Sequence, residues 1–285
     1  MPFVVPMDRA QAEFPDYNFI SPLTPSAQKA AFHVRDENGN DLCLKIISPL
    51  HSMDERFQRE VQFLQTISHP NIAKLIEYTL SSRPGQYRHY IIEEYIDGVD
   101  LKEKLRHGEC WSRPDASSIF SQLCDGLYEC CNRGVVHRDL KPTNIRLKPN
   151  DSPVIIDFGT ARHLNLPDIT KTSEGAAFGT WPWFAPEQFQ GTKYDIDHRT
   201  DLFALGILLY EALIGKHPFY QLGMTYEEGQ EATCYSNDCF SDSGFLALPF
   251  QWKLILDRLL RKNRSERPKD AGQVGTILRR IGEIL

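Results

Sequence analysis

The sequence predicts an α+β protein in which a small antiparallel β-sheet with one main helix precedes a larger, mainly helical part. The first observation is an alternating pattern from about Ala30 to Ile47, interrupted by Asn38-Gly39, a strong signal for a hairpin. The second is the strongly apolar segment Leu202–Leu213, which Gly215 closes. A helix that is apolar on all sides belongs in a protein core.

The elements before and after the hairpin follow from local patterns. The first 17 residues contain Pro2, Pro6 and Pro15, which indicates an arm that is either extended and packed on the smaller part or disordered. Ser52 and Glu55 form a capping box that begins the main helix. Apolar residues recur in it at helical spacing and form an inward face: Phe57, Val61, Leu64 and Ile67.

Further elements complete the prediction. The segment His69–Ile72 ends the main helix and begins a second strand pair, which closes with Tyr90–Tyr95. Pro114 opens a long helix over residues 116–133, and Gly134 ends it, as is common for helices. The chain contains no internal repeat and no low-complexity linker.

Composition limits the classes of partner. The net charge of −6 predicts no broad basic face, so nucleic acid is not an expected partner. The seven cysteines lack metal-type spacing, and no signal peptide is recognisable, which favours reduced thiols and a cytoplasmic location. The longest apolar stretch, Phe203–Ile214, is too short to span a bilayer and contains Glu211, so no membrane association is expected.

Three motifs follow one another along the chain, and the ordered set indicates a chemical function more specifically than any single motif does. The run His137-Arg138-Asp139-Leu140-Lys141-Pro142-Thr143-Asn144 is followed by Asp157-Phe158-Gly159 and then by Ala185-Pro186-Glu187. Phosphoryl transfer requires an oriented acceptor, metal ions that screen phosphate charge, and a cation near the transferred group. Asp139 can accept the acceptor's proton, Asn144 and Asp157 can hold metal, and Lys141 can lie beside the transferred group.

With these motifs the chain resembles the eukaryotic-type serine/threonine protein kinase family, from about residue 20 to the C-terminus. The resemblance implies a bilobal protein-kinase fold, with an arm over residues 1–17, an N-lobe over 18–95 and a C-lobe over 96–285. It also implies ATP and Mg²⁺ as cofactors, and transfer of the γ-phosphate to serine or threonine hydroxyls of a protein. Regulation is expected to come from a partner or from autophosphorylation, and a regulatory partner or transient self-association is the expected interaction.

The resemblance also assigns nucleotide-binding residues. Lys45 would grip the α- and β-phosphates, and Glu60, which adjoins the inward face of the main helix, would pair with it. The backbone of Glu94 to Ile96 would bind adenine, and Asp100 would contact the ribose. Glu93 stands at the gatekeeper position, which is normally apolar or threonine, so a pairing with a neighbouring residue is one interpretation and a shifted alignment is another.

The nucleotide-binding loop departs from the family pattern because residues 20–31 contain no glycine. Glycine lets backbone N–H groups approach phosphates closely. Here the three glycine positions align with Thr24, Ser26 and Lys29. We expect the two hydroxyls and the ammonium group to replace backbone contacts in part, and the KM for nucleotide to be raised.

Other residues are expected to support the catalytic segment. By resemblance, Asp201 braces the backbone of the catalytic loop, and Glu187 forms a buried salt bridge with Arg267. Thr180 would contact the catalytic aspartate and lysine.

The segment before Glu187 carries candidate sites of regulation. Arg138 precedes the presumed base, an arrangement typical of kinases that loop phosphorylation activates. Thr170, Thr172 and Ser173 are candidate phosphorylation sites, although loops are often rich in such residues.

Two alternatives remain at this point. A pseudokinase scaffold would use the same fold to bind a partner, and the glycine-free loop and Glu93 favour it. A small-molecule kinase of the aminoglycoside or choline type would share the catalytic and metal-binding aspartates. Thr180, Glu187 and Arg267 argue against that alternative, because these elements shape a platform for peptide substrates.

Overall fold

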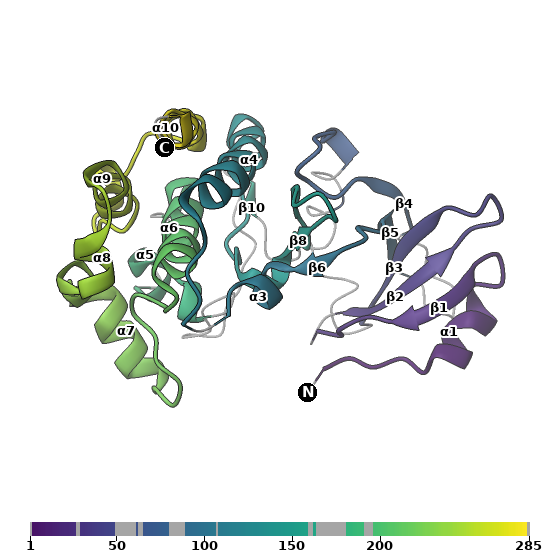
Figure 1. Ribbon diagram of the computed structural model, residues 1–285. Coiled ribbons are helices and arrows are strands. Elements are labelled where there is room, and N and C mark those ends of the chain that lie inside the picture. The colour runs from purple at the N-terminus through teal and green to yellow at the C-terminus, as the bar shows by residue number, and fades with distance from the viewer. Residues whose placement is uncertain are drawn as a thin grey trace. The chain divides into compact units, whose positions relative to one another are not determined.

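A computed structural model describes residues 2–26, 29–48, 61, 65–79, 89–106, 108–158, 162–163, 181–190 and 196–283. The chain divides into two compact units, Met1–Ile96 and Asp97–Leu285. The first unit contains an antiparallel sheet and the second is mainly helical, which confirms the predicted α+β fold class (Figure 1).

The first unit is built on a five-stranded sheet with strand order β1-β2-β3-β5-β4. Its elements are α1 (Met7–Glu13), β1 (Asn18–Pro22), β2 (Lys29–Arg35), β3 (Asp41–Ile47), β4 (Leu75–Thr79) and β5 (Tyr90–Glu94). The predicted hairpin is confirmed as β2 and β3. In its turn, the Asp36 carboxylate accepts hydrogen bonds from the backbone N–H groups of Asn38 and Asn40, and Gly39 takes a φ of 83°.

One face of this sheet is covered by the N-terminal arm, which packs on the smaller unit as one of the two interpretations expected, but is partly helical where an extended segment was expected. Met7–Glu13 forms the helix α1, and Ala10 and Phe14 join the core beside Phe32 and Leu44 (Figure 1). The reason is burial of apolar surface: the arm supplies side chains that the sheet face alone would leave exposed to water.

Aromatic and polar contacts also connect the arm with β4 and β5. Phe14 meets Tyr90 edge-on, with ring centroids 5.0 Å apart. The carboxylate of Glu77 on β4 accepts hydrogen bonds from the hydroxyls of Tyr90 at 2.6 Å and Tyr17 at 3.3 Å. The arm is therefore an integral layer of the first unit.

The opposite face of the sheet holds a smaller apolar cluster. Ile47 and Ile91 pack with Val61, and the partly buried Leu75 and Tyr78 border them. Val61 belongs to the predicted main helix, of which residues 61 and 65–66 are described as helical. The predicted capping box, Ser52 with Glu55, lies outside the described residues.

The second unit consists of helices with two small sheets, β6-β8-β9 and β10-β7. Its strands are β6 (Val99–Asp100), β7 (Val135–Val136), β8 (Ile145–Leu147), β9 (Pro153–Ile155) and β10 (Arg162–His163). Its α-helices are α3 (Leu101–Lys104), α4 (Arg113–Asn132), α5 (Pro186–Phe189), α6 (Arg199–Ile214), α7 (Tyr226–Tyr235), α8 (Ser243–Ala247), α9 (Phe250–Leu259) and α10 (Ala271–Glu283).

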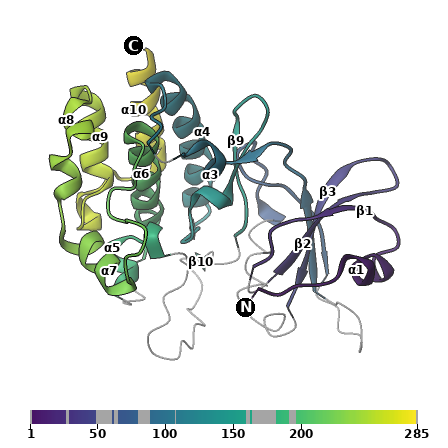
Figure 2. The ribbon, with the colours of Figure 1, turned by 60° about the horizontal axis from the view of Figure 1, so that its bottom comes forward.

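Helix α6 forms the centre of this unit, with α4 and α9 packed against it and α10 alongside α4 (Figure 2). Nearly all of its residues are buried, as its continuous apolar sequence predicts. Gly215 closes it at a φ of 76°. At Gly206, an added Cβ would lie 2.7 Å from the Cβ of Leu259, so glycine permits the close approach of α9.

The two predicted helix ends in α4 are also confirmed. Ser112 is the N-cap, and its hydroxyl accepts a hydrogen bond from the Asp115 N–H. Pro114 lies in the first turn, and Gly134 follows the helix with a φ of 69°.

All seven cysteines fall in the described ranges, and each is a free thiol. Among the helices that the structure describes, none combines the length and apolar character needed to cross a bilayer.

His217 is a titratable group of intermediate exposure beside the 3₁₀ turn Trp181–Trp183, and its Nε2 atom is buried. Its ring lies 5.9 Å from that of Trp183, and its Nδ1 accepts hydrogen bonds from the backbone N–H groups of Phe219 and Tyr220. Burial lowers the pKa of His217 to about 3, because a charged imidazole would lose its hydration. The folded protein therefore holds this histidine neutral.

This environment predicts a pH-dependent stability difference between the wild type and His217→Asn, which retains an acceptor but cannot titrate. In the unfolded chain His217 binds a proton below pH 6.5, whereas in the folded protein it does so only near pH 3. Its contribution to stability is thus complete above pH 6.5 and is lost as the pH falls. The stability advantage of the wild type should shrink by about 1.4 kcal/mol per pH unit below 6.5.

Urea unfolding of both proteins at pH 7.5, 6.0 and 5.0 measures that difference. Burial raises the pKa of Glu211 to about 7, which gives stability the opposite pH dependence. Glu211 is present in both proteins, so its contribution cancels in the difference. A gap that stays constant from pH 7.5 to 5.0 would contradict the neutral state of His217.

Candidate active site

The catalytic-loop motif connects β7 with β8 and is held by a buried carboxylate from α6. The Asp201 Oδ2 and Oδ1 atoms accept hydrogen bonds from the backbone N–H groups of His137 at 2.8 Å and Arg138 at 2.9 Å. Asp201 is 3% exposed, and burial raises the pKa of its carboxyl group. The geometry is that of the predicted brace.

The loop backbone is strained at the residue before the presumed base. Arg138 has a φ of 66°, and Asp157 has a φ of 63°, both in the left-handed region. The Gln188 side chain donates a hydrogen bond to the Arg138 carbonyl at 2.9 Å, while its own oxygen accepts one from the Ala185 N–H. Asp201 therefore holds the N–H group of the strained residue, and Gln188 holds its carbonyl group.

Asp139, Lys141 and Asn144 converge at the end of this loop. The Lys141 ammonium group lies 2.8 Å from Oδ2 of Asp139. The Asn144 amide donates to the Asp139 backbone carbonyl at 2.8 Å and to the same Oδ2 at 3.2 Å. Two donors thus fix the orientation of a partly buried carboxylate, which suits a group that must accept a hydroxyl proton.

Strand pairing brings the two predicted metal ligands into neighbouring positions. Ile145 on β8 pairs with Ile155 on β9, so Asn144 lies beside Ile156, whose N–H donates to the Asn144 carbonyl. Asp157 follows directly. His137 stabilises the same junction: its Nε2 lies 3.3 Å from the Ile156 carbonyl, and its ring meets Phe158 edge-on.

The donor set at this junction suits magnesium. Because the Asn144 amide nitrogen faces Asp139, its oxygen is the atom that can act as a ligand, together with the Asp157 carboxylate. Mg²⁺ is commonly held by one or two carboxylates plus phosphate oxygens, without an all-protein cage. Within the described ranges, no cluster of three or more His, Cys, Asp or Glu suited to a metal occurs.

In the first unit, Lys45 on β3 forms an ion pair with Glu93 on β5. The Nζ and Oε2 atoms are 2.7 Å apart, and the two side chains are 8% and 3% exposed. Glu93 therefore pairs with a neighbour, as one of the two interpretations of its unusual position anticipated. Glu60, the predicted partner of Lys45, lies outside the described residues.

In the loop that replaces the glycine-rich segment, Ser26 and Lys29 are hydrogen-bonded to each other. The Ser26 hydroxyl accepts a hydrogen bond from the Lys29 N–H at 3.1 Å, and the Ser26 N–H donates to the Lys29 carbonyl at 2.9 Å. The N-terminal arm contacts the same loop, because the Phe3 N–H donates a hydrogen bond to the Ser26 carbonyl at 2.7 Å. Thr24 is exposed, whereas Lys29 is buried.

The remaining predicted nucleotide contacts lie at the end of β5 and in β6. The Glu94 and Tyr95 N–H groups donate to the carbonyls of Lys74 and Asp41, so both are engaged within the first unit. Ile96 is buried and ends that unit. Asp100, the predicted ribose contact, forms a 2.8 Å ion pair with Arg146 in the second unit.

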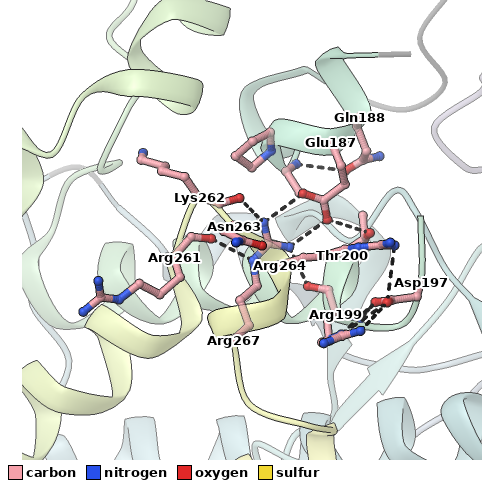
Figure 3. A network of polar contacts seen from close by, with 12 residues as sticks. Glu187, Gln188, Asp197, Arg199, Thr200, Arg261, Lys262, Asn263, Arg264 and Arg267 are labelled. Atoms are coloured by element: carbon pink, nitrogen blue, oxygen red, sulfur yellow. Dashed lines mark hydrogen bonds and ion pairs between the residues drawn. The ribbon is translucent and has the colours of Figure 1, made fainter. Parts of the chain in front are cut away.

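The predicted Glu187–Arg267 salt bridge is present and fully hydrogen-bonded (Figure 3). The two guanidinium NH groups lie 2.7 and 2.8 Å from the two carboxylate oxygens, and the Arg267 side chain is completely buried. Arg267 also donates to the backbone carbonyls of Arg199, Arg261 and Lys262. The Thr200 hydroxyl donates to Glu187 at 2.8 Å.

Several predicted residues cannot be placed. Thr170, Thr172, Ser173 and Thr180 lie outside the described residues, as does Glu60.

Sequence reasoning assigned no role to Gln188 and no partner to Glu93. The only available signal for Gln188 was an amide directly after the Ala185-Pro186-Glu187 motif. For Glu93 it was a carboxylate within an otherwise apolar strand, which burial makes costly without a partner.

Comparison with known proteins identifies a family model. Residues 29–275, most of the chain, match the model described as protein kinase domain.

Curated relatives agree with that match. A probable serine/threonine-protein kinase of Corynebacterium efficiens is 32% identical over 191 residues, which are 66% of this chain and 29% of the relative. Serine/threonine-protein kinase PknB of Mycolicibacterium smegmatis is 34% identical over 164 residues, 58% of this chain and 26% of the relative. The chain thus spans less than a third of the length of these relatives.

The buried Glu187–Arg267 pair predicts a large loss of stability in Arg267→Met. Among the described residues, the substitution leaves the Thr200 hydroxyl as the remaining side-chain donor to the buried Glu187 carboxylate. Removal of one partner from a buried pair costs about 3–5 kcal/mol. Arg279→Met is the matched control, because Arg279 pairs with Asp125 at the surface with side chains 47% and 39% exposed. Its cost should be at most about 1 kcal/mol.

Urea denaturation of the wild type and both variants measures these two costs. Equal costs for the two arginine substitutions would show that burial of the Glu187–Arg267 pair has no special energetic weight.

Proposed function

Because this chain belongs to the protein kinase family, we propose that it transfers the γ-phosphate of Mg-ATP to serine or threonine hydroxyls of a protein substrate. The observation that carries the proposal is the orientation of the Asp139 carboxylate by Lys141 and Asn144. A scaffold without activity would not need a carboxylate placed between a cation and an amide in this way.

The reaction forms a bond between the acceptor oxygen and the γ-phosphorus and breaks the bond from that phosphorus to the β–γ bridging oxygen. ADP leaves with the electron pair of the broken bond. Asp139 orients the acceptor hydroxyl and takes its proton, and Lys141 offsets negative charge on the transferred group. Bound Mg²⁺ would supply the remaining positive charge, with Asn144 and Asp157 as its protein ligands.

The proposed nucleotide contacts are the residues that the family resemblance assigns. Lys45 is proposed to contact the phosphates, and Thr24, Ser26 and Lys29 to replace part of the missing glycine-rich backbone. The hydrogen bonds between Ser26 and Lys29, which keep these two residues close together, support this assignment. The backbone of Glu94 to Ile96 and the Asp100 side chain are the proposed contacts for adenine and ribose.

The serine/threonine specificity of the acceptor rests on similarity to relatives that carry this name. A cytoplasmic location is proposed because the seven cysteines are free thiols, as is usual in a reducing compartment. We also propose that a partner regulates the protein, or that a second copy of this chain does so through autophosphorylation.

The test is incorporation of labelled γ-phosphate from Mg-ATP, with and without a generic basic protein substrate. Asp139→Asn should lower kcat by about 10²- to 10⁴-fold, because the amide cannot take the acceptor's proton. Asp125→Asn, which removes an exposed carboxylate from α4, is the control and should leave kcat unchanged.

Three results separate the alternatives. Incorporation that Asp139→Asn abolishes supports the proposed activity. Wild-type protein that binds nucleotide but transfers no phosphate to any protein, or that phosphorylates only small alcohols, would contradict it. Phosphate transfer that persists in Asp139→Asn would contradict the role of Asp139.

A further inference from the structure

The Lys45–Glu93 ion pair places two opposite charges on one face of the sheet in the first unit. Their charged atoms are 2.7 Å apart, and both side chains are almost completely buried. The residues that pack on the same face, Ile47, Val61 and Ile91, are apolar. A buried ammonium group in such surroundings requires a nearby negative charge to remain protonated.

Strand register explains why these two residues meet. In the β3–β5 pairing, Lys45 lies opposite Ile91 and Cys43 lies opposite Glu93. Glu93 is therefore the diagonal neighbour of Lys45 on the same face, at a separation that long side chains span readily. Both strands are consecutive members of the sheet, so their hydrogen bonding alone brings the carboxylate to the lysine.

This arrangement has a consequence for the geometry of the lysine. A lysine side chain has four rotatable bonds and loses much rotamer freedom when a bound phosphate holds it. Contact with Glu93 already restricts the ammonium position before nucleotide binds.

We propose that Glu93 is a positioning residue for nucleotide binding, which holds the Lys45 ammonium group charged and oriented for the phosphates of ATP. The proposal rests on the function proposed above. It assigns a role to the carboxylate at the position where an apolar residue or threonine was expected. The role is exerted through Lys45 and requires no direct contact of Glu93 with nucleotide.

The test is a double-mutant cycle on ADP affinity, measured by isothermal titration calorimetry with Mg²⁺ present. Glu93→Gln keeps the size and a hydrogen-bond acceptor but removes the charge. A hydrogen bond to a charged group is worth enough that ADP affinity should fall about 10- to 100-fold. In a Lys45→Met background the same substitution should change ADP affinity by less than about twofold, because its target is absent.

Steady-state kinetics give an independent readout. Glu93→Gln should raise the KM for ATP by a factor similar to the loss of ADP affinity and leave kcat within about twofold, because ground-state binding is what it weakens. Glu77→Gln is the matched control: it removes one carboxylate charge from the same sheet, at a position that contacts Tyr17 and Tyr90. Its ADP affinity should equal that of the wild type.

A shorter carboxylate covers the case in which Glu93→Gln does not fold. Glu93→Asp retains the charge at a greater distance from Lys45, so its ADP affinity should lie below the wild type. Circular dichroism confirms that each variant is folded.

The outcomes separate the two proposals. If the wild type binds ADP and either Glu93 variant binds it equally or more tightly, the positioning role is wrong and the kinase function stands. An undiminished effect of Glu93→Gln in the Lys45→Met background also overturns it, since Glu93 would then act without Lys45. A wild type that binds no nucleotide would overturn both proposals.

Discussion

The second unit depends on one buried carboxylate, that of Asp201. It is almost fully desolvated, and its two oxygens accept the consecutive N–H groups of His137 and Arg138. A carboxylate removed from water is costly unless such donors replace the lost hydration. The catalytic loop therefore supplies what Asp201 requires, and Asp201 in return fixes the backbone that presents Asp139. Loss of either partner would leave the other unsatisfied.

The first turn of α6 extends this mutual dependence to three segments that are distant in sequence. Arg199 offers its carbonyl to Arg267, Thr200 donates to Glu187, and Asp201 holds the catalytic loop. One helical turn thus connects the C-terminal region with the start of α5 (Figure 3), and it also holds the loop of the presumed base. Since α6 is buried along nearly its whole length, this turn cannot shift without repacking the core.

The parts of the structure that sequence reasoning anticipated are those with strong local signals. The hairpin turn with Gly39 and the end of α6 at Gly215 follow from backbone conformations that glycine adopts most easily. The helix α1 was missed because its single buried small residue, Ala10, gives no apolar periodicity, and its stability comes from the sheet beneath it. Glu93 was noticed, yet its contact with Lys45 could not be derived, because it depends on the register between two strands separated by more than forty residues.

Arg138 illustrates how conformational strain and chemistry can select different residues. Its left-handed backbone is a conformation in which most side chains cost about 1–2 kcal/mol and glycine costs almost nothing. A search for more stable variants that scores backbone conformation alone would choose glycine here. It would thereby remove the guanidinium group directly before Asp139, where the sequence carries an arginine. Positions at which such a search and the natural sequence disagree are therefore a way to find functional residues without knowledge of any substrate.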